Sequence, residues 1–214
     1  MFGQQAGMRL PTEVQRYYES ALWSTQLYAD ATALAGRASD SLFGTRKGGN
    51  GNGFAASLTI AETNMDEAGR IASGLAFTTR QVACEVRYTD NFPMCHMDLA
   101  NVQKNLVLTW SFLNTFVHIA PVNLIGQGGG IFGTTADTGA ADGANGGSRT
   151  ILNNGAGQTW IYHELPVLLP ANTTFSVQLQ WGGLATAVDG GVNNSAMEIR
   201  GSLIGVATSA IPEG

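Results

Sequence analysis

The sequence predicts a mainly β protein, an antiparallel β-sandwich preceded by an N-terminal helical arm. Three observations support this fold class. After about residue 54, apolar residues recur at every second position, segments with this pattern follow one another closely, and no long helical pattern separates them. Strands without intervening helices are typical of antiparallel sandwiches and not of parallel α/β sheets.

The first expected element is a helix of about 24 residues that ends near Gly36. Residues 12–15 match a capping box, in which the Thr12 side chain accepts a hydrogen bond from the amide of Gln15. A stripe of residues then recurs at helical spacing, formed by Val14, Tyr18, Leu22, Thr25, Ala29 and Thr32. Such a helix packs either on its own domain or, as an arm, on a neighbouring subunit. For the second case the candidate subunit-interface residues are Val14, Tyr17, Tyr18, Leu22, Trp23 and Tyr28.

A glycine-rich segment, residues 43–53, follows the expected helix and is interpreted as a flexible linker or loop. The chain therefore divides into residues 1–53, the arm and its linker, and residues 54–214, the sandwich. The glycines do not form a phosphate-binding motif, because the spacing G-x-x-x-x-G-K-[ST] is absent. If this division is correct, deletion of residues 1–36 should leave the sandwich folded.

Eight strands are expected in the sandwich. Their approximate ranges are 54–62, 73–80, 81–89, 104–112, 113–120, 158–164, 172–181 and 196–208. The segment 172–181 shows the alternation clearly, with Phe175, Val177 and Leu179 on one face and glutamines and serine on the other. Two segments rich in Gly, Ala, Asn and Asp, 126–157 and 182–195, are expected to be long loops.

The composition limits the classes of partner. Charged residues make up 13% of the chain, whereas soluble domains usually contain about 25%. With 28 glycines and many small polar residues, the surface is typical of a subunit whose faces are buried in an assembly. The formal net charge is −5, and no cluster of basic residues exists. Direct nucleic-acid binding is therefore not expected, because it needs several clustered cations.

No pattern of residues indicates catalysis. A nucleophile motif of the form G-x-S-x-G is absent. The three histidines, His96, His118 and His163, do not form a ligand pair on a strand, so neither a metal nor a cofactor is expected. Cys84 and Cys95 are interpreted as free buried thiols, with a single disulfide as the alternative. We do not expect an enzyme; a cupin-like or glycan-processing activity would require a metal or paired carboxylates.

Two parts of the chain resemble a known family. In residues 116–131 a strand ends in proline and leads into an apolar, glycine-rich loop. In residues 162–175 the run Leu-Leu-Pro-Ala-Asn leads into an alternating strand, and 197–206 closes the domain. This pattern resembles the jelly-roll capsid proteins of tailless icosahedral bacteriophages, many of which contain an internal lipid membrane. The resemblance implies a virion subunit without catalytic residues, and the chain length implies a single jelly roll.

From these observations we expect a structural virion protein, a bacteriophage capsid subunit that assembles into an icosahedral shell. Its partners would be copies of itself and other capsid proteins, and contact with an internal virion membrane is compatible with the resemblance. The alternative is a phage receptor-binding or carbohydrate-binding β-sandwich module. Such a module would present aromatic side chains on its loops.

Overall fold

The computed structural model describes residues 15–28, 37–88, 105–113, 115–125, 161–181 and 196–210. Within these ranges the chain is mainly β-strand, and the strands are antiparallel. A single turn of 3-10 helix, η2 (Val122–Leu124), follows the fifth strand. No helix in the described ranges is long and apolar enough to cross a membrane. The prediction of a mainly β, antiparallel fold is confirmed.

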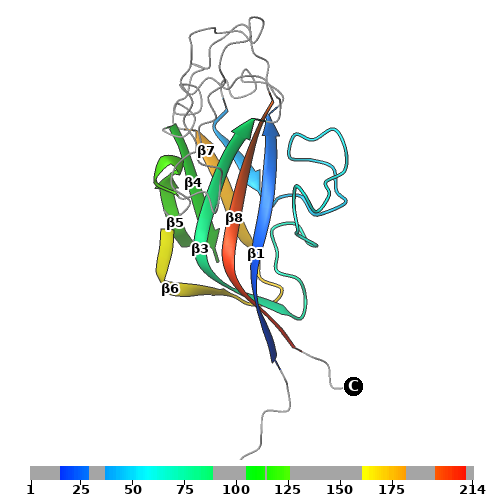
Figure 1. The fold of residues 1–214 in the computed structure, drawn as a ribbon, viewed down its shortest axis with the longest axis vertical. Coiled ribbons are helices and arrows are strands. Elements are labelled where there is room, and N and C mark those ends of the chain that lie inside the picture. The colour runs from blue at the N-terminus through cyan, green and yellow to red at the C-terminus, as the bar shows by residue number, and fades with distance from the viewer. Residues whose placement is uncertain are drawn as a thin grey trace, which may run out of the picture.

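In the described residues, eight strands form two four-stranded sheets that lie face to face (Figure 1). They are β1 (Gln15–Tyr28), β2 (Ser39–Leu42), β3 (Leu75–Tyr88), β4 (Leu106–Phe112), β5 (Thr115–Pro121), β6 (Ile161–Leu169), β7 (Phe175–Trp181) and β8 (Met197–Ala210). Sheet A has the order β1-β8-β3-β6, and sheet B has the order β2-β7-β4-β5. The pairing is nested, since β1 pairs with β8, β2 with β7, β3 with β6 and β4 with β5.

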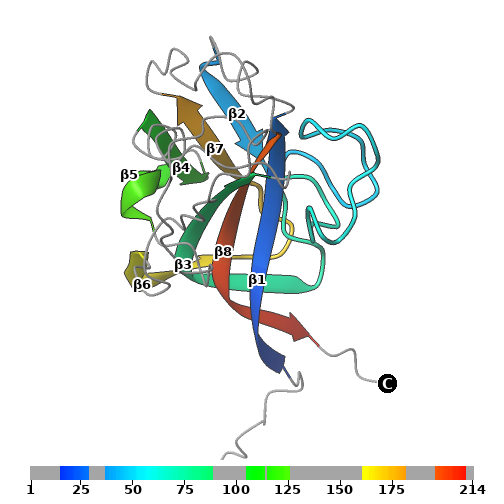
Figure 2. The same cartoon turned by 45° about the horizontal axis from the view of Figure 1, so that its top comes forward.

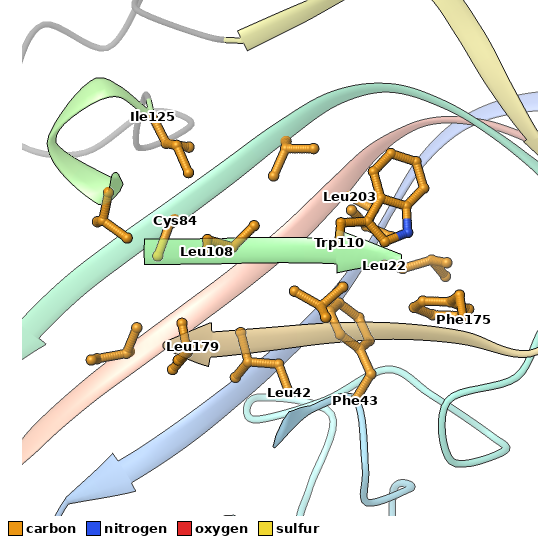
Figure 3. Packing of buried hydrophobic residues seen from close by; sticks show 14 of the residues in the cluster. Leu22, Leu42, Phe43, Cys84, Leu108, Trp110, Ile125, Phe175, Leu179 and Leu203 are labelled. Carbon is orange, nitrogen blue, oxygen red and sulfur yellow. The ribbon is translucent and has the colours of Figure 1, made fainter. Parts of the chain in front are cut away.

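The core lies between the two sheets. In β7 every second side chain is buried, as its sequence alternation predicts. Figure 3 shows side chains of β4 and β7 meeting those of β3 and β8 in the space between the sheets. The largest fully buried side chains are Trp110, Tyr28, Phe43, Phe77, Leu42, Ile71, Leu106, Leu108, Ile125 and Leu169. On β8, Gly201 leaves room for Leu42 of the opposite sheet, because a Cβ there would lie 2.6 Å from Leu42 Cδ1.

The expected N-terminal helix is wrong, because residues 15–28 form strand β1. β1 pairs with β8 along its whole length, from Gln15–Ala210 to Tyr28–Met197. Its backbone N–H and C=O groups therefore form hydrogen bonds with a strand that is distant in the sequence and not within a helical turn. Every second side chain from Leu22 to Tyr28 is buried. Two of these buried positions hold Ser24 and Gln26, and these polar residues hide the two-residue period in the sequence.

The segment after β2, residues 43–74, is an ordered connection that packs beside β1 (Figures 1 and 2). It covers the outer edge of β1: Leu27 N donates to Asn52 O at 2.8 Å, and Asn64 N donates to Trp23 O at 3.3 Å. The side chain of Asn64 makes two more bonds to the same edge. The expected linker 43–53 is therefore part of the covering of sheet A, and strands on both sides of the expected boundary at 53/54 share sheets. A covered edge cannot pair with a foreign strand.

The other expected strands agree with the structure to different degrees. The ranges 104–112, 113–120, 172–181 and 196–208 correspond to β4, β5, β7 and β8, and 158–164 overlaps β6. The ranges 73–80 and 81–89 are a single strand, β3, and 54–62 contains turns and no strand. The expected loops 126–157 and 182–195 lie outside the described residues.

Deletion of residues 1–36 is the first test of this fold. The deletion removes β1, so β8 loses one of its two partner strands and the inner side chains of sheet A lose their cover. We expect the truncated chain to lose its cooperative unfolding transition and most of its strand signal in far-UV circular dichroism. Deletion of residues 1–14, which keeps β1, is the control and should retain both. A folded protein lacking residues 1–36 would contradict the observed pairing.

A second test concerns the contact between residues 43–74 and β1. Gly53 has φ +78°, and a Cβ there would lie 2.0 Å from Leu27 O. Gly48 has nearly the same φ, +79°, but a Cβ there would meet nothing within 4 Å. Both changes to Ala therefore carry the cost of a left-handed backbone, which is roughly 1 kcal/mol, and only Gly53→Ala adds a clash. In urea unfolding, Gly53→Ala should destabilise the protein clearly more than Gly48→Ala; equal losses would contradict this contact.

Candidate interaction surfaces

The outer face of sheet B carries no charged side chain among the residues whose side chains the structure describes. The strand register places three rows of outward-facing residues across this sheet. The rows are Ser39, Gln180, Val107 and Pro121; Ser41, Gln178, Thr109 and Ile119; and Ser176, Ser111 and Phe116. Thr109, on the central strand β4, is itself buried, and its Oγ1 donates to Gln178 O at 3.4 Å. Asp40 of β2 does not belong to this face, because it pairs with the buried Leu179. The face therefore changes from hydroxyl and amide groups at β2 to apolar side chains at β5.

Exposed apolar side chains lie along β5 and at its two ends. They are Leu113 in the turn before β5, Phe116 and Ile119 on the strand, and Leu124 in η2; we call these four residues the β5 patch. Their exposed fractions are 69%, 62%, 58% and 64%, respectively. A β-bulge at Val117 turns that side chain toward the core and sets Phe116 and Ile119 on the outer face. Exposed apolar residues that gather on one strand are typical of a protein interface.

The outer face of sheet A has a different character. Glu19, Glu85, Glu198 and Arg200 occupy outward positions in its register. Arg200 binds the covering segment to the sheet: its Nε donates to Thr25 Oγ1 at 3.0 Å and its Nη2 donates to Ala61 O at 2.7 Å. These hydrogen bonds hold the segment over β1, so part of this face is already used within the chain.

The same segment is closed by a turn at Glu62. Its Oε2 accepts hydrogen bonds from both the amide and the hydroxyl of Thr59, each at 2.6 Å. The hydrogen bond from the Thr59 side chain is the largest cause that lowers the pKa of Glu62, and Arg200 lowers it further.

The segment 43–74 also carries two ion pairs, Lys47–Asp66 and Glu67–Arg70. Both are exposed and contribute little to stability. The segment 43–74 runs beside β1, on the opposite side of the molecule from β5 (Figures 1 and 2).

Asp40 is the centre of a polar cluster that joins the two sheets. Its Oδ2 accepts a hydrogen bond from Tyr28 Oη of sheet A at 2.9 Å and one from Trp181 Nε1 of sheet B at 3.3 Å. The rings of Tyr28 and Trp181 pack edge to face, with centroids 5.7 Å apart. Arg37 pairs with Asp40, and its guanidinium lies 5.2 Å from the centre of the Tyr28 ring. Burial and the negative charge of Asp40 raise the pKa of Tyr28 well above its ordinary value of 10.0.

The interface residues expected from the N-terminal pattern lie in different environments. Tyr28 and Leu22 are buried in the core of this chain, where a neighbour cannot reach them. Trp23 is half-buried, and its Nε1 donates to Ile60 O at 3.0 Å. Tyr17 and Tyr18 are exposed on β1. Val14 lies outside the described residues.

Of the histidines and cysteines considered for chemistry, Cys84 is the one whose side chain the structure describes. His118 lies on β5 and His163 on β6, but their side chains are not described, and His96 and Cys95 lie outside the described residues. Cys84 is a buried thiol on β3, and burial raises its pKa to about 12. In the described part of the chain, no group of three or more His, Cys, Asp or Glu side chains could hold a metal ion.

Sequence reasoning missed the β5 patch, although Phe116 and Ile119 lie in a strand that it located. The three-residue spacing of these two side chains fits neither face of a regular strand, and only the bulge at Val117 brings them to the same side. A signal for sheet B was nevertheless present. Positions 176, 178 and 180, between the apolar residues of β7, hold serine and glutamine, where a free surface strand usually carries charges.

Comparison of the chain with protein-family models, with curated proteins and with solved structures finds no match.

The Asp40 cluster makes a prediction about pH. Replacement of Tyr28 by Phe removes the hydrogen bond to Asp40 and should lower the free energy of unfolding at about pH 8 by roughly 1–3 kcal/mol. Because the pKa of Tyr28 is raised in the folded chain, the unfolded chain releases this proton first as pH rises above 10.0. The stability that Tyr28 contributes is present below that pH and is lost above it.

The difference in unfolding free energy between wild type and Tyr28→Phe should therefore shrink from about pH 8 to about pH 11, measured by urea unfolding at both values. Tyr18→Phe, at an exposed position of the same strand, is the control and should change stability by less than about 0.5 kcal/mol. A difference that grows with pH would contradict the environment of Tyr28.

Proposed function

We propose that this chain is a structural virion protein, a single jelly-roll capsid subunit of a bacteriophage that assembles with copies of itself into an icosahedral shell. Its partners are further copies of the chain and other capsid proteins, and it has no enzymatic role. The proposal is supported by the strand pairing, by the packed interior and by the uncharged outer face of sheet B.

The nested strand pairing supports the jelly roll. A jelly roll is a double sheet of eight antiparallel strands, and viral capsid domains are among its common forms. When one long hairpin is wrapped into two sheets, its strands pair in a nested order. The first strand pairs with the last, the second with the seventh, the third with the sixth and the fourth with the fifth. The sheet orders β1-β8-β3-β6 and β2-β7-β4-β5 follow this scheme.

The packed interior supports a structural role for this sandwich. Lectin domains and cupins share the jelly-roll architecture, and in small barrels a ligand site needs interior space. Here Trp110, Leu108 and Leu179 of sheet B meet Cys84 and Leu203 of sheet A, and all five are buried. Buried side chains of both sheets thus meet in the described interior, as in a protein that serves as a building unit.

The single observation that carries the proposal is the uncharged outer face of sheet B, which ends in the β5 patch. Burial of a charge that lacks a partner is costly, whereas hydroxyl, amide and apolar groups are buried in interfaces at small cost. A surface of this kind suits a subunit that is covered on assembly. The alternative, a receptor-binding or carbohydrate-binding module, would present aromatic side chains on loops. All three described tryptophans lie on strands instead: Trp110 and Trp181 are buried, and Trp23 is half-buried.

The proposal is tested by the state of the purified full-length chain. We expect light scattering to give a mass that is a multiple of the 22.4 kDa chain, and negative-stain images of the same peak to show regular oligomers or closed shells. Circular dichroism of the peak should show the β signal, which separates assembly from aggregation of unfolded chain. A folded protein that stays monomeric at all accessible concentrations would overturn the proposal.

A further inference from the structure

We infer that the outer face of sheet B packs against the same face of a second copy of this chain, across a two-fold axis that runs beside β5. The inference rests on the proposed function and identifies the surface and the partner that would carry the assembly. In this contact the β5 patch forms the apolar centre, and the serines and glutamines of β2 and β7 form the polar rim.

The distribution of charge selects this face for a contact between identical chains. A two-fold contact places a surface opposite its own copy, so a charged side chain near the axis meets a like charge. The chain carries a net charge of −5, and the outer face of sheet A presents charged groups, namely Glu19, Glu85, Glu198 and Arg200, of which Arg200 lies opposite Glu85 and also binds the covering segment. The outer face of sheet B has no such group among its described side chains, so two copies can meet there without like-charge repulsion.

Leu113 adds exposed apolar surface at one end of the β5 patch. It lies between Phe112 and Thr115, which pair in the β4–β5 hairpin, and its φ of 49° is the positive value that a two-residue hairpin connection requires. The hairpin therefore fixes the backbone of Leu113, and its side chain is left 69% exposed.

The contact is expected between faces and not between strand edges. The bulge at Val117 interrupts the regular spacing of β5, and Pro121 at the end of the strand has no amide hydrogen to donate. These features disfavour the addition of a foreign strand to the edge of sheet B. Phe116 and Ile119, in contrast, project from the outer face and can interdigitate with their copies.

A charge-swap experiment at Ile119 tests the inference. Ile119→Asp and Ile119→Lys each place like charges near the axis, so each variant alone should associate roughly 100-fold more weakly than wild type in sedimentation velocity. In an equimolar mixture Asp and Lys face each other across the axis, and association should return. Circular dichroism of each variant confirms that it is folded.

The matched controls are Ile60→Asp and Ile60→Lys. Ile60 is as exposed as Ile119, 62% against 58%, but it belongs to the segment 43–74 and lies beside β1, where Trp23 Nε1 donates to Ile60 O at 3.0 Å. These variants should associate as wild type does. If the Ile119 variants also associate normally, or if the mixture does not restore association, the two-fold contact is wrong while the proposed function stands. A wild-type chain that never associates would overturn both.

Discussion

The pairing of β8 with both β1 and β3 is the interaction on which the rest of this structure depends. β8 lies inside sheet A and pairs with β1 from Met197 to Ala210 and with β3 over nearly the same length. Its inner positions hold apolar residues and two glycines. Gly201 allows Leu42 to approach closely, and Gly205 allows the backbone of Thr78 to do so. Because the strand nearest the C-terminus joins the strand nearest the N-terminus, sheet A forms only when the two ends of the chain meet.

This arrangement separates the two outer faces by charge. The covering segment 43–74 lies beside β1, is bound to sheet A by Arg200, and carries most of the described ion pairs. Sheet B keeps an uncharged outer face because its outward positions hold serine, threonine, glutamine and apolar residues. The Asp40 cluster connects the two sheets through Tyr28 and Trp181. One side of the molecule is thus partly covered within the chain, whereas the outward positions of sheet B that the structure describes carry no charge.

The strands that were predictable are those whose inner positions are all apolar. Phe175, Val177 and Leu179 mark β7 without knowledge of its neighbours. β1 was not predictable because Ser24 and Gln26 occupy buried positions, and their burial depends on Asn52 and on the covering segment. The β5 patch was equally hidden, because its common face depends on a bulge that exists only in the pairing of β5 with β4. The low charge of the chain, in contrast, was visible at once and indicated a protein with large buried faces.

The sequence by itself determined the mainly β class, the positions of the strands from β4 onward, and a surface with few charges, because alternation and composition are local properties of the chain. Tertiary structure alone decided that residues 15–28 are a strand, since backbone groups take the partner that is nearest in space and β8 provides it. It also decided which charges share a face. That outcome depends on strand register, and a shift of one residue would exchange the inner and outer side chains of a strand.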